Sequence, residues 1–321
     1  MNHMYFCGMN AECVCHWPLK TIDDTVTTMN MTTDCLLCSI RQIDTLLKNM
    51  DIGEETRLRH MQELLRILAE IDASMSPPAA AAVFHARIKQ LTGIDDPFEG
   101  VKRDSNAIAL GVLSEVRSIV NGSRQPLASA LLASVAGNII DYGVRDKISK
   151  ADIINALYDS LDGAIGDGFV ARFENDMKNS TRILFVCDNA GEIVFDRLLI
   201  EKMPAEKITV AVRGFPIIND ATFDDARQAG LDSMVRVITT GDATPGIDIG
   251  RSSEEFMEAF ASSEMIIFKG QGNLETMLHA DVSNFVKDGA TLYFLLKIKC
   301  GRVAELLHKK INDNFFFAKE T

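Results

Sequence analysis

The first half of the chain carries the hydrophobic spacing of amphipathic helices. Between residues 35 and 178, apolar side chains recur every three or four positions, as at Leu58, Met61 and Leu65, which places them on one face of a helix. Proline or glycine interrupts the pattern at residues 76–78, 95–97 and 121–126. The pattern predicts a mainly α-helical N-terminal domain over residues 31–178.

After residue 179 the pattern changes to short apolar runs, separated by segments long enough for helices. The runs occupy residues 182–187, 208–213, 234–239, 265–269 and 291–299. Strands that alternate with helices favour a Rossmann-like α/β domain with a largely parallel sheet covered on both faces; we assign it to residues 179–321. Ligands of such sheets bind beyond the carboxyl ends of the strands, so we expect the chemistry at that edge.

Composition argues against two classes of partner. The 321 residues have a formal charge of −12 at pH 7, which disfavours nucleic-acid binding because that affinity comes from lysine and arginine neutralising phosphates. No apolar run approaches the roughly 18 residues needed for a membrane helix. We therefore expect neither nucleic acid nor membrane as a partner, and the oligomeric state stays open.

The cysteines and the first residues indicate the compartment. Seven cysteines, an odd number in a chain too large to need disulfides for stability, favour a reduced, cytoplasmic protein. Residues 1–30 lack the basic start and continuous apolar stretch of a secretory signal. Because their pattern does not continue into Asp34, we expect them to form an extension outside the fold.

Cys35 and Cys38 have the spacing of a metal-binding or redox pair. A zinc site needs two further ligands, for which Cys300 and the cysteine and histidine residues within 13–16 are candidates. Since no second pair stands at zinc spacing, two buried thiols in a helix are the better interpretation. The histidines do not cluster, so a Ser-His-Asp or Cys-His hydrolase is not supported.

Polar residues follow several of the predicted strands. Asp188 and Asn189 come after the first strand, Asp220 follows the second, and Lys297 and Lys299 belong to the last. Each has a purely structural alternative, because an aspartate can cap the next helix and a lysine at a strand end can be solvated. Two carboxylates and an amide at one rim nevertheless favour a divalent cation such as Mg²⁺, which prefers oxygen ligands.

A glycine-rich turn, 269-KGQGNLE-275, follows the fourth strand. It lacks the third glycine of a dinucleotide fingerprint and is weak evidence for a nucleotide. A turn of this kind that opens a helix still offers amide hydrogens and the positive end of a helix dipole to a phosphate. Lys269 adds positive charge beside Gly270, so we expect a phosphate at this turn.

Seven blocks along the chain resemble a known family when they are taken in order. The blocks are 34-DCLLCSIRQ-42, 102-KRDSNAIAL-110, 137-GNIIDYG-143, 188-DNAGEIVFD-196, 213-RGFPIINDAT-222, 269-KGQGNLE-275 and 296-LKIKC-300. They are similar to those of the metal-dependent damage-control phosphatases, long known as domain of unknown function 89, in the prokaryotic branch with a CxxC near its start. The resemblance covers residues 34 to about 307.

This resemblance implies a helical part on an α/β domain and a phosphatase that hydrolyses small phosphomonoesters, such as sugar phosphates or damaged phosphometabolites, with Mn, Mg, Co or Ni. It implies that Asp188, Asn189 and Asp220 hold the metal, and that Asn273 and Lys299 lie near the phosphate. The predicted catalytic residues are thus Asp188, Asp220 and Lys299, and the predicted phosphate-binding residues are Asn189, Lys269, Gly270, Asn273 and Lys297.

Two other functions remain as alternatives. A carboxyl methyltransferase with a sulfonium methyl donor suits a doubly wound sheet, and a relative in the resembled family has that assignment, but it leaves the carboxylate and amide set unexplained. A non-catalytic metabolite-binding protein would need no metal. A phospho-aspartate at Asp188 is disfavoured because Ala190 stands where haloacid-dehalogenase-type enzymes have a second aspartate.

Overall fold

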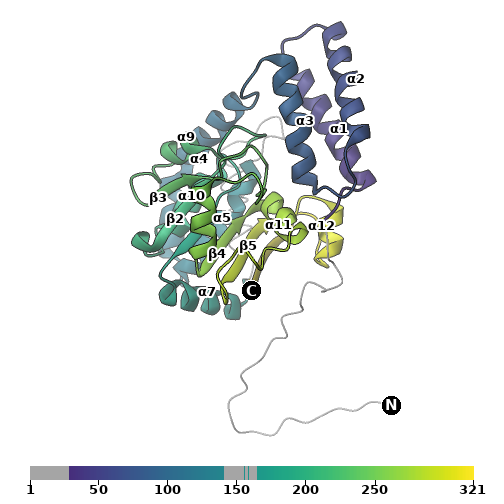
Figure 1. The fold of residues 1–321 in the computed structure, drawn as a ribbon. Helices are drawn as coiled ribbons and strands as arrows, with labels where there is room; N and C mark the ends of the chain where they lie inside the picture. Colours follow the sequence, from purple (N-terminus) through teal and green to yellow (C-terminus); the bar gives the residue numbers. More distant parts are fainter. Residues whose placement is uncertain (1–28, 141–154, 156–157, 159–164) are drawn as a thin grey trace, which may run out of the picture.

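The computed structural model describes residues 29–140, 155, 158 and 165–321. Helices α1, α2 and α3 form one end of the molecule (Figure 1) and pack through an apolar cluster that includes Leu47, Leu64 and Phe84. Their bounds are Thr33–Lys48, Glu54–Glu70 and Pro77–Thr92. The predicted interruption at 76–78 is a helix start, because the Ser76 side chain accepts the Ala79 N–H and prolines follow it.

The other described helices of the first half pack against the sheet or against the helices that cover it. They are α4 (Glu99–Gly122), α5 (Pro126–Ala136), the 3₁₀ helix η1 (Gly137–Ile140) and α7 (Asp167–Asn179). Val116, Leu131 and Phe173 share one apolar core with Phe185 and Ile193 from the second half. The described strands all come after residue 178, and the hydrophobic core extends across this sequence boundary.

The second half forms a six-stranded sheet in the order β3-β2-β1-β4-β5-β6. The strands are β1 (Ile183–Val186), β2 (Ile208–Val212), β3 (Arg236–Thr239), β4 (Met265–Lys269), β5 (Thr291–Lys297) and β6 (Asn314–Glu320). All neighbouring pairs are parallel except β5 and β6. The predicted α/β class with a largely parallel sheet is confirmed, although β6 was not among the predicted strands.

Helices cover both faces of this sheet (Figure 1). They are α8 (Glu192–Ile200), α9 (Phe223–Gln228), α10 (Glu254–Ser262), α11 (Gly270–His279) and α12 (Gly301–Leu306), with the short η2 (Ala205–Lys207) before β2. Alternate residues of β1 enter different cores: Ile183 and Phe185 pack on one side and Leu184 and Val186 on the other. Burial on both faces explains why central strands such as β1 and β4 read as continuous apolar runs.

The fold begins slightly earlier than predicted. Met29 is buried in the core beneath α12, and its sulfur lies 3.4 Å from Nε of Arg302. The last residues of the predicted 1–30 extension are therefore packed against the protein, and residues 1–28 lie outside the described residues.

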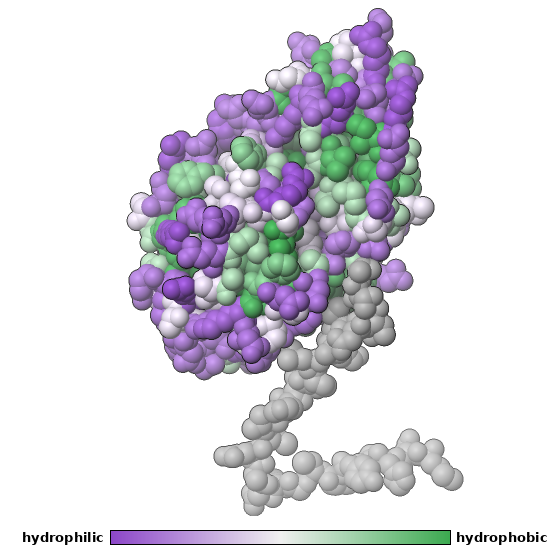
Figure 2. Space-filling model, in the orientation of Figure 1, coloured by the Kyte–Doolittle hydropathy of each residue, from purple (hydrophilic) through white to green (hydrophobic). Residues whose placement is uncertain are grey.

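The surface is mixed in character. Figure 2 shows polar residues over much of one face, with apolar areas among them, some at the end formed by α1, α2 and α3. None of the described helices is long and apolar enough to cross a membrane.

Candidate active site

Two turns at the carboxyl edge of the sheet are joined by their backbones. Asn189 and Asp220 pair in an isolated antiparallel bridge. The Ala190 N–H donates to Asn219 O at 2.9 Å, and the Ala221 N–H donates to Asp188 O at 2.8 Å. The turn after β1 and the end of the long loop after β2 are thereby held together. They lie next to the neighbouring strands β1 and β4, between which the strand order reverses, and this is the usual ligand position in such sheets.

Neither aspartate is the N-cap residue of the helix that follows it. The N-cap of α8 is Gly191, and that of α9 is Thr222. The Asp225 carboxylate accepts from the Thr222 N–H at 2.8 Å and from its hydroxyl at 2.7 Å. Because Gly191 and Thr222 occupy the N-cap positions, the interpretation of Asp188 and Asp220 as helix caps is not supported.

The side chain of Asn189 is oriented by carboxylates. Its Nδ2 donates to Asp188 Oδ2 at 2.6 Å and lies 3.3 Å from Glu192 Oε2. Asn138 donates to the same Glu192 oxygen at 2.6 Å. With its nitrogen committed to two anions, the amide of Asn189 turns its oxygen the other way, as a ligand to a cation requires.

Lys269 lies beneath this site and is fully buried. Its Nζ donates to Glu192 Oε1 and Asp196 Oδ1, each at 2.6 Å, and to Ser134 O at 3.0 Å. Burial acts to lower the pKa of Lys269, but the two carboxylates raise it above its ordinary value. The lysine that we expected at a phosphate is instead bonded to anions under the rim, and its charge acts on the site through them.

Gly270 lies directly against Asp188. Its φ is +79°, and a Cβ placed there would meet Asp188 Cγ at 2.0 Å. The carboxylate therefore occupies the space that a side chain would fill, at the first turn of α11, where helix amide hydrogens favour negative charge. Only glycine permits both the backbone conformation and this approach.

Arg213 joins the second aspartate to the glycine-rich turn. Its Nε donates to Asp220 Oδ2 at 2.6 Å and its Nη2 to Asn273 Oδ1 at 3.0 Å, and the guanidinium is buried. Asn273 in turn donates to Lys269 O at 2.6 Å and Cys187 O at 3.2 Å. Asn273 is thus held rigidly at the ends of β1, β2 and β4.

The site has an excess of buried negative charge. Burial, and then the charge of Glu192, raise the pKa of Asp188 well above its ordinary value, and Asp220 adds to the effect. Lys299 and Arg213 act in the opposite direction. A cation beside Asp188 would relieve this repulsion, because carboxylates brought together resist joint ionisation.

The residues present suit a hard divalent cation. Asp188, Asp220 and Asn189 offer two carboxylates and one amide oxygen from backbone-locked turns, and Mg²⁺-type ions need only a few protein oxygens. Within the described part of the chain, no group of three or more His, Cys, Asp or Glu side chains is arranged to hold a metal. The candidate set depends on the amide of Asn189 as its third member.

The two predicted lysines of the last strand occupy different positions. Lys297 ends β5 and pairs with Asn314 of β6. Lys299 lies beyond the strand, is exposed, and donates its N–H to Gln271 Oε1 at 3.0 Å. Because its charge lowers the pKa of Asp188, the Lys299 ammonium is within electrostatic range of the site.

The CxxC pair lies in the first turns of α1. Cys35 is half-buried and Cys38 exposed, and both are free thiols, as are Cys187 and Cys300. The prediction that the pair belongs to a helix is confirmed, whereas its burial is only partial.

A cavity of about 430 Å³ lies beside the Asp220 loop, lined by groups from α4, α9 and the residues after β2. Lys102 on its wall contacts Asp96 at 2.8 Å and Asp225 at 3.5 Å. Burial acts to lower the pKa of Lys102, but these carboxylates raise it overall. The cavity wall therefore presents this lysine already paired with two carboxylates.

Comparison with known proteins identifies the family. Residues 31–315 match the model of the damage-control phosphatase ARMT1-like domain. The chain belongs to this family. An Archaeoglobus fulgidus protein named damage-control phosphatase is 32% identical over 288 residues, which cover 87% of this chain and 96% of that protein. A Pyrococcus horikoshii damage-control phosphatase is 32% identical over 284 residues, 87% of this chain and 94% of the relative.

A solved structure supports the same assignment. The crystal structure of a DUF89 family protein from Pyrococcus horikoshii superposes with a TM-score of 0.77 at 30% identity, and covers 89% of this chain and 98% of that one. The family that the sequence blocks resemble and the fold that they imply are both confirmed.

Sequence reasoning missed several residues that shape the site. Glu192 and Asp196 stand four apart on α8, which is otherwise largely apolar, and Arg213 follows directly after β2. A charge inside a buried apolar segment signals a buried pair, and that signal was present in the sequence. Asn106 and Asp225 lie far apart in sequence, and nothing in the local pattern links them.

Proposed function

We propose that this protein is a metal-dependent phosphatase that hydrolyses small phosphomonoesters, with a divalent cation (Mn²⁺, Mg²⁺, Co²⁺ or Ni²⁺) held by Asp188, Asn189 and Asp220. The observation that carries the proposal is the pair of buried carboxylates on two joined turns, where burial and then the charge of Glu192 raise the pKa of Asp188. The names of the relatives, damage-control phosphatase, support a small phosphorylated metabolite as the substrate.

The cation, when bound, supplies a Lewis acid and lowers the pKa of a water molecule. The chain's own groups hold and balance the phosphoryl group. The first amides of α11 face an anion at the sheet edge, and Asn273 braces that turn through its bonds to Lys269 O and Cys187 O. The ammonium of Lys299 offsets negative charge on the phosphoryl oxygens. Water adds to phosphorus as the bond to the leaving alcohol breaks, which gives inorganic phosphate and the free alcohol.

Buried groups keep this arrangement fixed. Lys269 neutralises part of the charge of Glu192 and Asp196, so that Glu192 can remain an acceptor for the Asn189 amide. Arg213 orients Asp220 and Asn273 with two donors from one planar group. Since the described cysteines are free thiols, we also propose that the protein acts in the reducing cytoplasm.

The test is a panel of small phosphomonoesters assayed for phosphate release with each of the four metals, with and without chelator. Wild type should require metal, while Asp188→Asn and Asp220→Asn should lose about 10²-fold or more in activity and still fold. Lys299→Met should be impaired at saturating metal. Asp224→Asn, which removes an exposed carboxylate paired with Arg227, is the matched charge control and should behave as wild type.

Chelator-insensitive activity, or full activity in both aspartate variants, would refute the proposal. Methyl transfer from a sulfonium donor without phosphate release would support the methyltransferase alternative instead. Tight binding of a phosphorylated metabolite without turnover at any metal concentration would support a binding protein.

A further inference from the structure

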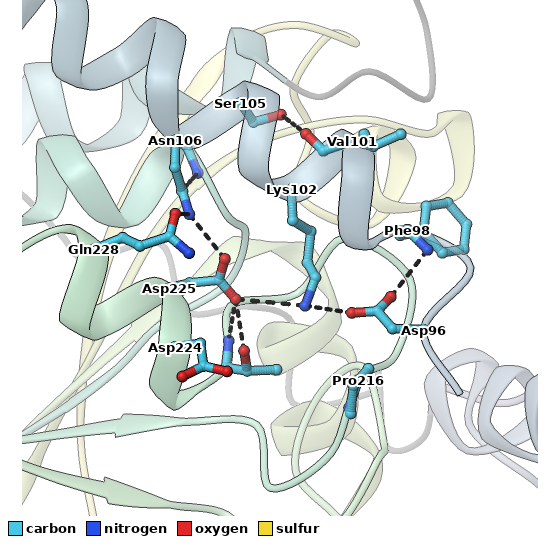
Figure 3. Close-up of polar contacts among 12 residues, drawn as sticks. Asp96, Phe98, Val101, Lys102, Ser105, Asn106, Pro216, Asp224, Asp225 and Gln228 are labelled. Carbon is cyan, nitrogen blue, oxygen red and sulfur yellow. Dashed lines mark hydrogen bonds and ion pairs between the residues drawn. The ribbon is translucent and has the colours of Figure 1, made fainter. Parts of the chain in front are cut away.

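One buried asparagine of the helical half bonds directly to one turn of the candidate metal site and is linked to the other through Asp225 of α9. Asn106 lies on α4 and is inaccessible to solvent. Its Oδ1 accepts the Gly191 N–H at 2.7 Å, and its Nδ2 donates to Asp225 Oδ1 at 2.8 Å. Figure 3 shows Asn106 directed from α4 toward Asp225. The oxygen and the nitrogen of this one amide therefore bond to two segments that are distant in sequence.

Each contact lies close to a candidate metal ligand. Gly191 stands two residues after Asn189, and its φ of +79° turns its N–H toward α4. Asp225 in turn accepts hydrogen bonds from the N–H and the hydroxyl of Thr222, which stands two residues after Asp220. The bridge between Asn189 and Asp220 joins the two turns on one side, and Asn106 ties them together on the other.

We propose that Asn106 is a positioning residue that holds the two metal-bearing turns at the separation that a divalent cation requires. The inference rests on the proposed function and adds that metal affinity depends on a residue of the helical half. Truncating this side chain would leave the Gly191 N–H and one Asp225 oxygen buried without the hydrogen-bond partner that Asn106 provides. The two turns would then shift to regain partners. Loss of groups that orient metal ligands typically weakens binding by about 10–100-fold.

The experiment is a calorimetric Mn²⁺ titration of the metal-free full-length protein without substrate, paired with kinetics across Mn²⁺ concentrations. Asn106→Ala should raise the Mn²⁺ Kd by about tenfold or more. At saturating Mn²⁺ its kcat should recover to within about threefold of wild type, because Asn106 has no contact with the reacting groups in this proposal. If Asn106 only stabilised the fold, Asn106→Ala would lower the melting temperature, but the Kd for Mn²⁺ would not rise and kcat would not recover at saturating Mn²⁺.

Tyr293→Phe is the matched control for lost stability. Its hydroxyl donates to Asp176 of α7 at 2.7 Å and so also joins a helix of the first half to the sheet, away from the two turns. This variant should melt at a lower temperature than wild type and keep the wild-type Mn²⁺ Kd. If Asn106→Ala does not fold, Asn106→Ser, which keeps a small polar group, should show the same direction of change.

The outcomes separate this inference from the proposed function. A folded Asn106 variant with the wild-type Kd for Mn²⁺ would overturn the role of Asn106 and leave the phosphatase proposal standing. A Kd that rises equally in Tyr293→Phe would overturn it too, since general destabilisation would then explain the loss. A wild-type protein that neither binds Mn²⁺ nor releases phosphate would overturn both.

Discussion

Replacing Lys269 by methionine tests the electrostatics beneath the site. Lys269, Glu192 and Asp196 are each at most 1% exposed, and the lysine donates to both carboxylates at 2.6 Å. Even with that lysine present, burial raises the pKa of Asp196 to about 6. Methionine keeps the volume and removes the charge, so two buried carboxylates would face each other without a cation.

The cost follows from the charge that must then be neutralised. Breaking a buried ion pair by removing one partner destabilises a protein by about 3–5 kcal/mol. If one carboxylate takes up a proton instead, keeping it protonated costs about 1.4 kcal/mol for each pH unit above its unfolded pKa near 4. The penalty at pH 7.5 is therefore about 5 kcal/mol, and it falls by up to about 3 kcal/mol on going to pH 5.5.

The sign of the pH dependence is fixed by linkage. A carboxyl group whose folded pKa is raised binds more protons in the native state than in the unfolded state, so stability falls as pH rises between the two pKa values. Lys269→Met should therefore be closest to wild type in mildly acidic buffer. Urea denaturation of both proteins at pH 5.5 and pH 7.5 measures the difference.

Lys287→Met provides the matched control, because Lys287 forms an ion pair with Glu264 at the surface, where its side chain is 48% exposed. It should cost at most about 1 kcal/mol at either pH. A loss below about 1 kcal/mol in Lys269→Met at pH 7.5, or a penalty that grows toward acid pH, would refute the reasoning. The double variant Lys269→Met/Asp196→Asn should regain part of the stability, since it removes one unpaired charge.

Two further changes test packing at the site and at the start of the fold. Gly270→Ala should abolish phosphatase activity and weaken Mn²⁺ binding, because the new Cβ would overlap Asp188. The control is Gly289→Ala, where φ is +73° and the space around the new Cβ is open. This control should lose only about 1 kcal/mol of stability to backbone strain and keep its activity. Deleting residues 1–28 should keep the wild-type melting temperature, whereas extending the deletion through Met29 should lower it by removing a buried side chain.

The central strands were predictable because each of them is buried on both faces. The runs 265–268 and 292–296 carry mainly large hydrophobic residues, and the polar residue that follows such a run marks the edge where ligands bind. Asp188 and Asn189 could be found in this way. The strand β6 was not predicted, because this edge strand is only partly buried, with Phe315 and Ala318 as its buried residues, and so lacks a continuous buried run.

The direction of each side chain was not predictable. Lys269 ends an apolar strand and was expected to face a phosphate, but it faces Glu192 and Asp196, which lie 77 and 73 residues away in sequence. The contacts of Asn106 with Gly191 and Asp225 span 85 and 119 residues. Periodicity reports which face of an element is buried, and it contains no information about which polar group from a distant segment meets another there.

These long-range contacts share one property, which bears on how the site is built. Ser134 and Asn138 from the α5–η1 segment contact the Asp196 and Glu192 carboxylates, and Asn106 from α4 contacts Gly191 of one turn and Asp225 of α9 beside the other. The α/β half supplies the candidate ligands, but groups of the helical half satisfy the buried polar atoms that orient them. Because unsatisfied buried polar groups force a local structure to rearrange, the ligand geometry at Asn189 is a property of both halves together, and the sequence boundary at residue 178 does not divide the site from its support.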